Sequence, residues 1–247
     1  INTIMERVGI LGSSFSVGCH HNSNTKQNDL ALPFETWLYK HTTDIEFYNS
    51  ACSGKGTELY LNKIVYLKKK YNIDTVLMEL VNNRSMLNMK TQEYDLDNIT
   101  DDLYKDSSSI WNYVRAITQD INYEKFATRR EFDTWKSVQE NIAYNFNAFE
   151  YWGVLDCKQA IELCELLDIK VVTWQKSFDF REHIPQTVKF SDFANAHEYY
   201  VDKYDEKSIL CDHVHFNDKI NEEMIRDFID PMLINTFLLY TSSSTRN

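Results

Sequence analysis

The sequence lacks the features that define fibrous, disulfide-bonded or membrane-spanning chains. Its 247 residues contain only 6 glycines and 3 prolines, which excludes a collagen-like or linker-dominated architecture. The 5 cysteines are odd in number and include no Cys-x-x-Cys pair, so metal-finger spacing is absent and free, buried thiols are expected. No apolar run reaches the ~18 residues that a membrane-spanning helix needs.

A signal peptide and an excess of positive charge are missing as well. The N-terminus has no basic segment followed by an apolar run, so a cytoplasmic location is expected, although a chain that begins at Ile1 can lack an upstream segment. The 26 basic and 37 acidic residues give a net charge of −11. This balance argues against nucleic acid as a partner, because binding to a phosphate backbone needs a basic face. The oligomeric state has no signature in the sequence.

What is present is an ordinary globular composition, with 43% hydrophobic and 26% charged residues, in a chain long enough for one large domain. Short apolar runs alternate with segments of helical periodicity. The runs predict buried strands over 7–12, 45–48, 74–80 and 169–174, and the periodic segments predict helices over 29–41, 57–71 and 156–167. A last helix is expected from Asn217, a suitable N-cap, with an interruption at Pro231.

Alternation of strands and helices predicts an α/β fold with a parallel sheet covered on both faces. In such folds, functional groups gather at the carboxyl ends of the strands. The stretch 85–151 departs from the alternation, and we interpret it as a largely helical insertion after the third strand of a single domain, 1–247. It is rich in Trp, Tyr and Phe, most of which an insertion has to bury as its own core. The remainder are candidates for a platform that binds a sugar ring or an acyl chain.

Two short polar blocks at strand ends supply a nucleophile and a base. Ser13 and Ser14 follow a glycine at the end of the first predicted strand, where a serine in a tight turn is exposed beside backbone N–H groups. Asp212, His213 and His215 precede the last helix, and an Asp-x-x-His turn supplies a histidine base together with the carboxylate that orients it. Each block alone is equally typical of a structural turn, and the second is also typical of a weak metal site.

Two further blocks supply donors for an oxyanion. Gly54 lies in the loop after the second predicted strand, where glycine lets the main chain approach a ligand and present an N–H group. Asn82 and Asn83 follow the third predicted strand, and either amide can act as a second donor. The alternative for both is a turn or capping residue, and strand parity alone does not choose between them.

In this order and at these positions, the four blocks resemble those of the SGNH hydrolases, the GDSL-like esterase superfamily. The resemblance implies a nucleophile at Ser14 and a triad completed by Asp212 and His215. It implies an oxyanion hole formed by the Ser14 N–H group with Gly54 and Asn83. It also implies a flavodoxin-like three-layer α/β/α fold and ester hydrolysis through an acyl-enzyme, with no metal or organic cofactor.

The sequence departs from the pattern of that family in two blocks. It has Gly-Ser-Ser where Gly-Asp-Ser is common, and Val-Asn-Asn-Arg where Gly-x-Asn-Asp is usual. The serine in the third place is kept, which favours Ser14 over Ser13. Val81 and Arg84 alter the turn that carries Asn83, and this departure bears on the oxyanion hole.

The expected function is a serine esterase that acts on a carboxylic ester of a small molecule or a carbohydrate. An acyltransferase that uses the same triad is chemically close, because a sugar hydroxyl would replace water as the acceptor. The alternative from another class is an SGNH-like binding module with weakened catalysis, which recognises a glycan or a protein partner. The altered third block motivates this alternative.

Histidines near two of the blocks also allow a metal site. His20 and His21 follow the nucleophile turn and, together with His213 and His215, would offer a set of ligands. A structural role is the better interpretation of the first pair, and no metal is assigned. The Asp-x-x-His spacing favours His215 over His213 as the base.

Overall fold

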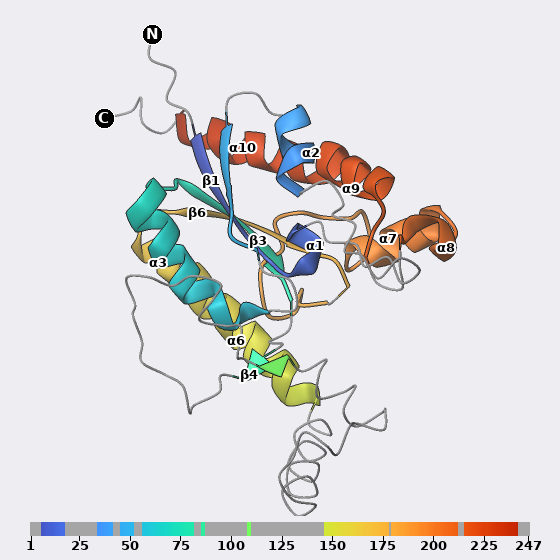
Figure 1. Ribbon diagram of the computed structural model, residues 1–247, viewed down its shortest axis with the longest axis horizontal. Helices are drawn as coiled ribbons and strands as arrows, with labels where there is room; N and C mark the ends of the chain where they lie inside the picture. The colour runs from blue at the N-terminus through green and yellow to red at the C-terminus, as the bar shows by residue number, and fades with distance from the viewer. Residues whose placement is uncertain are drawn as a thin grey trace, which may run out of the picture.

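A four-stranded parallel sheet lies at the centre of the protein, as the computed structural model in Figure 1 shows. The structure describes residues 6–17, 34–41, 45–51, 56–81, 85–86, 108–109, 146–177, 179–211 and 215–241. The strands, in the spatial order β2-β1-β3-β6, are β1 (Glu6–Leu11), β2 (Ile45–Asn49), β3 (Thr75–Leu80) and β6 (Lys170–Gln175). The predicted α/β class is confirmed, and each expected strand is present within one residue of its predicted ends.

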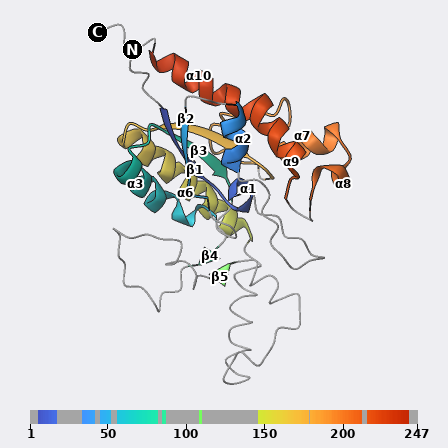
Figure 2. The ribbon, with the colours of Figure 1, turned by 45° about the horizontal axis from the view of Figure 1, so that its top comes forward.

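Helices cover both faces of this sheet, which gives the three layers of an α/β/α sandwich (Figures 1 and 2). On one face lie the 3₁₀ turn η1 (Thr57–Leu59), α3 (Tyr60–Tyr71) and α6 (Phe146–Leu166). On the other face lie α2 (Phe34–His41), α9 (Asp218–Met224) and α10 (Asp230–Thr241). Successive side chains of a strand point to opposite faces. Leu77 therefore packs with the second group of helices, and Val76 and Met78 pack with the first.

The helices α3 and α6 end in the same way, which directs the chain back into the sheet. Asn72 follows α3 and Asp168 follows the end of α6, with left-handed backbone at φ 49° and 55°. Asn and Asp tolerate this conformation better than other non-glycine residues do. The Asn72 N–H donates to the Lys68 carbonyl at 2.9 Å, and the Ile169 N–H donates to the Cys164 carbonyl at 2.8 Å. Each helix is thereby closed shortly before the next strand begins.

The helix α6 begins at Phe146 rather than at the predicted residue 156. The buried stripe of this helix starts at Val154 and continues through Cys157, Ala160 and Cys164, at intervals of three or four residues. The turns before Val154 carry exposed Tyr151 and Trp152. Neither of these two side chains adds to that stripe, and for this reason periodicity alone placed the start of the helix too late.

The last helix starts and breaks where the sequence indicates. The Asn217 side chain accepts a hydrogen bond from the Ile220 N–H at 3.1 Å, as an N-cap does. After α9 the chain forms a π-helical segment, η4 (Ile225–Ile229), which ends two residues before Pro231. The Asp230 N–H donates to the Ile225 carbonyl, five residues back. Proline clashes with the carbonyl four residues before it, and the wider π turn relieves this clash.

Two short helices precede this final helical region, namely α7 (Ala196–Lys203) and α8 (Glu206–Ile209). Of the expected insertion over 85–151, the structure describes β4 (Ser85–Met86) paired antiparallel with β5 (Ser108–Ser109), and the first turns of α6. The rest of the insertion lies outside the described residues. Among the helices that are described, none is both long and apolar enough to span a membrane.

We expect Asp230 to lower the stability of the protein at neutral pH. Its side chain is buried at the start of α10, its Oδ1 has no hydrogen-bond partner among the described residues, and burial raises its pKa, with His41 acting in the opposite direction. A carboxyl group with a raised pKa stabilises the fold most below its unfolded value, and this contribution is lost as the pH rises through the folded value.

Asp230→Asn should therefore raise the melting temperature at pH 7 by about 2–4 °C, the shift that ~1 kcal/mol produces in a protein of this size. The difference from the wild type should shrink as the pH falls towards 4. Thermal unfolding across this pH range measures it, and Asp202→Asn on the exposed face of α7 is the matched control. A gain that is the same at every pH would contradict the role of the charge.

Candidate active site

The first strand places a serine turn at the carboxyl edge of the sheet. β1 lies between β2 and β3, and it is followed by Gly12, Ser13 and the single-turn helix α1 (Ser14–Val17). Figure 1 shows α1 at the end of β1, on the side of the molecule that carries α7. Ser14 keeps an exposed fraction of 8%, whereas Ser13 is fully buried. Adjacent serines in one turn thus have different surroundings.

Ser14 contacts a histidine from the other end of the chain. The Ser14 Oγ and the His215 Nε2 are 2.8 Å apart, although the two residues are separated by 201 positions in the sequence. The His215 backbone is held in place because its carbonyl accepts a hydrogen bond from the Cys211 N–H at 3.0 Å. The Phe15 ring packs against the imidazole with its centroid 5.1 Å away. The structure therefore brings together two of the residues expected at the site.

The contact between Ser14 and His215 has the geometry of a nucleophile and its base. When the proton of the imidazole is on Nδ1, Nε2 accepts the hydrogen bond from the serine hydroxyl. A serine is a weak nucleophile at its ordinary pKa, and a base within hydrogen-bond reach activates it by removing the proton during attack. This arrangement can support acyl transfer to Ser14.

Ser13 has a different role, because it binds a buried carboxylate. Glu79 is 1% exposed and lies on β3, next to the end of β1. Its Oε2 accepts hydrogen bonds from the Ser13 N–H and from the Ser16 hydroxyl, each at 2.8 Å. Its Oε1 accepts a hydrogen bond from the Ser13 hydroxyl, also at 2.8 Å. The three bonds attach the serine turn to the neighbouring strand.

Glu79 is the site residue that sequence reasoning missed. The signal was visible, since β3 is otherwise apolar or β-branched, and acidic residues are almost never fully buried without partners. Position 79 shares the strand parity of Leu77, so its side chain points to the face of the sheet on which α1 lies. An isolated acid in a buried strand predicts a network, although not the identity of its donors.

Gly12 gives the carboxylate room to reach the turn. A Cβ atom at this position would lie 2.2 Å from the Ser16 Oγ and 2.6 Å from the Glu79 Oε2. Real Cβ atoms do not approach other atoms so closely, so a side chain here would displace one of the hydrogen bonds to Glu79. Glycine is therefore required at this position by packing.

Three expected site residues, Gly54, Asn83 and Asp212, lie outside the described residues, as do the alternatives Asn82 and His213 and the pair of histidines at 20 and 21.

The strand that leads to Gly54 is fixed at its end by Asn49. The Asn49 amide donates to the Ser16 carbonyl at 3.0 Å, and its oxygen accepts from the Ala51 N–H at 2.9 Å. In the described part of the chain, no group of three His, Cys, Asp or Glu side chains is placed to hold a metal ion.

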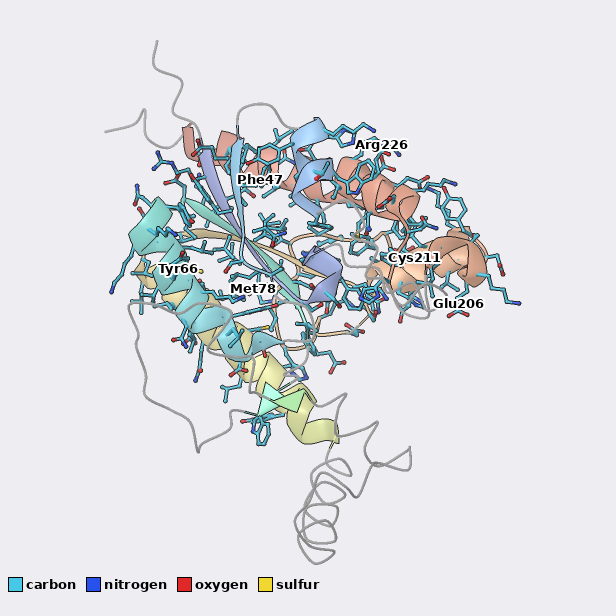
Figure 3. All side chains as sticks on the ribbon, in the orientation of Figure 1. Phe47, Tyr66, Met78, Glu206, Cys211 and Arg226 are labelled. Atoms are coloured by element: carbon cyan, nitrogen blue, oxygen red, sulfur yellow. The ribbon has the colours of Figure 1, made fainter. Side chains whose placement is uncertain are left out.

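The three cysteines that the structure describes differ in exposure, which corrects the expectation of uniformly buried thiols. Cys157 and Cys164 are buried in the layer of α6, and burial raises the pKa of both thiols, to about 12 for Cys164. Cys211, by contrast, is exposed, and its thiol lies 3.3 Å from the His215 carbonyl. Figure 3 shows it on the side of the molecule that carries α7 and α8. A cysteine next to a functional block therefore need not be buried.

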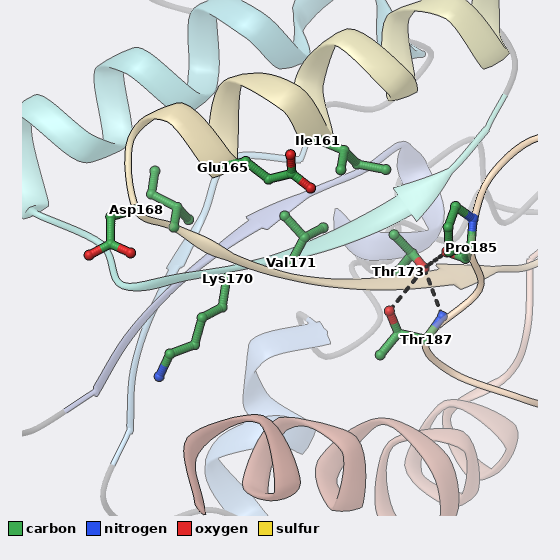
Figure 4. A pocket seen from close by; sticks show the side chains of 9 residues that line it. Ile161, Glu165, Asp168, Lys170, Val171, Thr173, Pro185 and Thr187 are labelled. Carbon is green, nitrogen blue, oxygen red and sulfur yellow. Dashed lines mark hydrogen bonds between the residues drawn. The ribbon is translucent and has the colours of Figure 1, made fainter. Parts of the chain in front are cut away.

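A cavity of about 460 Å³ lies away from the serine turn (Figure 4). It is bounded by the end of α6, the first half of β6 and the segment 185–187, and neither Ser14 nor His215 lines it. The Thr173 hydroxyl closes one side, since it donates to the Pro185 carbonyl at 3.1 Å and accepts from the Thr187 N–H at 2.9 Å. The residues that line this cavity include no nucleophile paired with a base, unlike the contact between Ser14 and His215.

Comparison with known protein families and with curated proteins finds no match. Among solved structures, the chain is similar to a psychrotrophic esterase, EstA, from Pseudoalteromonas sp., with 12% identity, a TM-score of 0.43, and coverage of 96% of this chain and 99% of that chain.

A lipase/acylhydrolase from Enterococcus faecalis has 14% identity and a TM-score of 0.32, covering 90% of this chain and 96% of that one. An α/β hydrolase enzyme from the metagenome of Lake Arreo, Spain, has 13% identity and a TM-score of 0.32, covering 90% and 91%. These likenesses are distant, and we base the function on the contact between Ser14 and His215.

Replacement of Glu79 by leucine and by glutamine tests whether the turn depends on the hydrogen-bond acceptors of this side chain or only on its volume. Glu79→Leu leaves the Ser13 N–H and two hydroxyl groups without their buried acceptor, and the free energy of unfolding should fall by at least ~3 kcal/mol. Glu79→Gln should cost much less, because its oxygen keeps the two bonds made at Oε2 while its NH₂ group donates to the Ser13 hydroxyl.

Urea unfolding measures both variants, with Glu182→Leu at an exposed position as the control. Equal losses in Glu79→Leu and Glu79→Gln would show that the charge of Glu79, and not its role as an acceptor, holds the turn.

Proposed function

We propose that the protein is a serine hydrolase that cleaves a carboxylic ester through an acyl-enzyme at Ser14. The observation that carries the proposal is the 2.8 Å contact between the Ser14 Oγ and the His215 Nε2 at the carboxyl edge of the sheet. The buried hydroxyl of Ser13 is engaged by Glu79 and does not compete for the substrate. Ser14 is therefore the nucleophile in this proposal.

The proposed reaction has two halves that use the same base. In the first, His215 Nε2 removes the proton of the Ser14 hydroxyl while the oxygen attacks the ester carbonyl carbon. The tetrahedral intermediate collapses, and the imidazolium returns the proton to the leaving alcohol. In the second half, His215 takes a proton from water, which attacks the acyl-serine, and the proton passes to Ser14 as the acid departs. Asp212 is proposed to accept a hydrogen bond from the Nδ1–H group, which orients the ring and stabilises the imidazolium.

The negative charge of the intermediate needs donors, and the serine turn offers one. Three neighbouring N–H groups are engaged: that of Ser13 by Glu79, and those of Phe15 and Ser16 by Ser13 oxygens. Among the described residues, no acceptor is assigned to the Ser14 N–H. We propose this group as one donor of the oxyanion hole, with the Gly54 N–H and the Asn83 amide as the others.

The proposed substrate is an ester with a short acyl group, carried by a carbohydrate or another small alcohol. Ser14 is only 8% exposed, and its partner His215 is packed against the Phe15 ring, which favours a compact acyl group such as acetyl. Transfer of the acyl group to a sugar hydroxyl instead of water would use the same groups. A panel of acylated sugars and simple esters, followed with and without an acceptor alcohol, distinguishes hydrolysis from transfer.

Labelling by a fluorophosphonate tests the nucleophile. The wild type should be labelled at Ser14 and should hydrolyse p-nitrophenyl acetate, whereas Ser14→Ala should lose labelling and up to ~10⁶ of kcat, since residues of a triad act as a unit. Ser13→Ala removes one hydrogen bond to Glu79, so it should lower stability slightly and kcat only mildly. Labelling that persists in Ser14→Ala but disappears in Ser13→Ala would reverse the assignment. A wild type that neither reacts nor turns over would favour the binding module.

The amide donor is tested at Asn83. A donor that acts mainly in the transition state lowers kcat when it is removed and leaves KM nearly unchanged. Asn83→Ala should therefore reduce kcat by ~10²–10³, and Asn82→Ala should have a small effect. Steady-state kinetics on both variants decide between them. A large rise of KM at normal kcat in Asn83→Ala would make this residue a substrate-binding group instead.

A further inference from the structure

A buried lysine lies beside the two aromatic rings that follow the members of the proposed catalytic pair. Lys176 follows the last residue of β6 and is 3% exposed. Its Nζ lies 4.4 Å from the centroid of the Phe15 ring and 4.9 Å from the centroid of the Phe216 ring. A cation over an aromatic face is attracted by the ring quadrupole, and the attraction is strongest where water is excluded.

The two rings belong to the residues that directly follow the proposed nucleophile and base. Phe15 comes after Ser14, and Phe216 comes after His215. Phe15 also packs on the imidazole, with the ring centroids 5.1 Å apart and the planes tilted by 53°. One ammonium group therefore contacts both of the chain segments whose relative position sets the distance from Ser14 Oγ to His215 Nε2.

The strand end that carries Lys176 is itself firmly held. The preceding residue, Gln175, is fully buried and donates to the Ala194 carbonyl at 3.1 Å, while its oxygen accepts from the Phe180 N–H at 2.8 Å. The Lys176 carbonyl accepts from the His197 N–H at 2.8 Å. The ammonium thus projects from a rigid support, which is what a positioning group needs.

The surroundings of Lys176 also respond to its charge. The His197 ring stacks on Phe216, the more distant of the two rings that Lys176 contacts, with centroids 6.3 Å apart and planes 11° from parallel. Burial, and after it the charge of Lys176, lower the pKa of His197, while Glu206 and Glu198 act in the opposite direction. The lowered pKa favours the neutral form of the imidazole beside the Phe216 ring.

We propose that Lys176 is a positioning residue that holds Ser14 and His215 in contact through the rings of Phe15 and Phe216. The expected effect on the reaction rate rests on the proposed function, whereas the expected effect on the distance between Ser14 and His215 does not. A misplacement of about 1 Å between reacting groups can cost ~10²-fold in rate. Loss of the ammonium should therefore reduce turnover while substrate binding stays intact.

The test compares Lys176→Met, which keeps the length of the side chain without its charge, with Lys176→Arg, whose guanidinium also binds aromatic faces. In Lys176→Met, kcat and the rate of fluorophosphonate labelling should both fall ~10- to 100-fold, with KM within about twofold of the wild type. Lys176→Arg should recover most of both rates. Lys207→Met, at an exposed position on α8, is the control and should behave as the wild type.

A second variant covers the case in which Lys176→Met fails to fold. Phe216→Leu keeps an apolar side chain but removes the ring face, and it should lower kcat at nearly constant KM in the same way. Rates per labelled site that match the wild type in both Lys176→Met and Phe216→Leu would overturn the inference, even if the melting temperature falls, because Lys176 would then serve stability alone.

Crystal structures separate this inference from the proposed function. If the wild type is not labelled, the proposed function fails, and the distance between Ser14 Oγ and His215 Nε2 then tests the role of Lys176. The two atoms should be within hydrogen-bond distance in the wild type and apart in Lys176→Met. An unchanged separation in the variant would overturn the role of Lys176. Normal labelling of the wild type together with equal labelling of Lys176→Met would overturn the inference and leave the serine hydrolase intact.

Discussion

The buried carboxylate of Glu79 is the interaction on which the geometry of the site depends. It joins the end of β1 to β3 through the Ser13 N–H and the hydroxyl groups of Ser13 and Ser16. A carboxylate that is removed from water is tolerated only when hydrogen bonds replace its hydration. The turn supplies those bonds at 2.8 Å, so the cost of burying the charge is offset by the conformation that the turn adopts. Gly12 lacks a side chain at the point where the carboxylate enters.

This anchor explains why two adjacent serines have separate roles. Because Ser13 points inward to Glu79, the next residue turns towards the edge of the sheet, where it meets His215. Lys176, in turn, contacts the rings that follow each member of the pair. A buried carboxylate and a buried ammonium thus contact the same short segments of the chain. Rigid support of this kind favours catalysis that depends on preorganised groups.

The sheet and the order of its helices could be predicted from the sequence, because apolar runs and helical periodicity are local signals. Ser14 and His215 could be proposed from the resemblance of short blocks at strand ends. Glu79 and Lys176 could not, since a buried charge is recognised by its partners, and the partners of Glu79 lie 63 and 66 positions away. The start of α6 was placed too late because Tyr151 and Trp152, which precede its buried stripe, are exposed. Polar contacts between residues that are distant in the sequence therefore could not be predicted from local sequence patterns.

The hydrogen bonds between Thr173 of β6 and the segment 185–188 do more than shape the cavity. In the described sheet β6 is an outer strand, and its Thr173 carbonyl accepts a hydrogen bond from the Val188 N–H at 2.9 Å. An outer strand with free N–H and carbonyl groups is a template on which a strand of another molecule can add. Here the chain occupies part of that template itself, with Pro185 beside it, a residue that has no N–H to offer. The bonds around Thr173 thus act against edge-to-edge aggregation when the protein is concentrated.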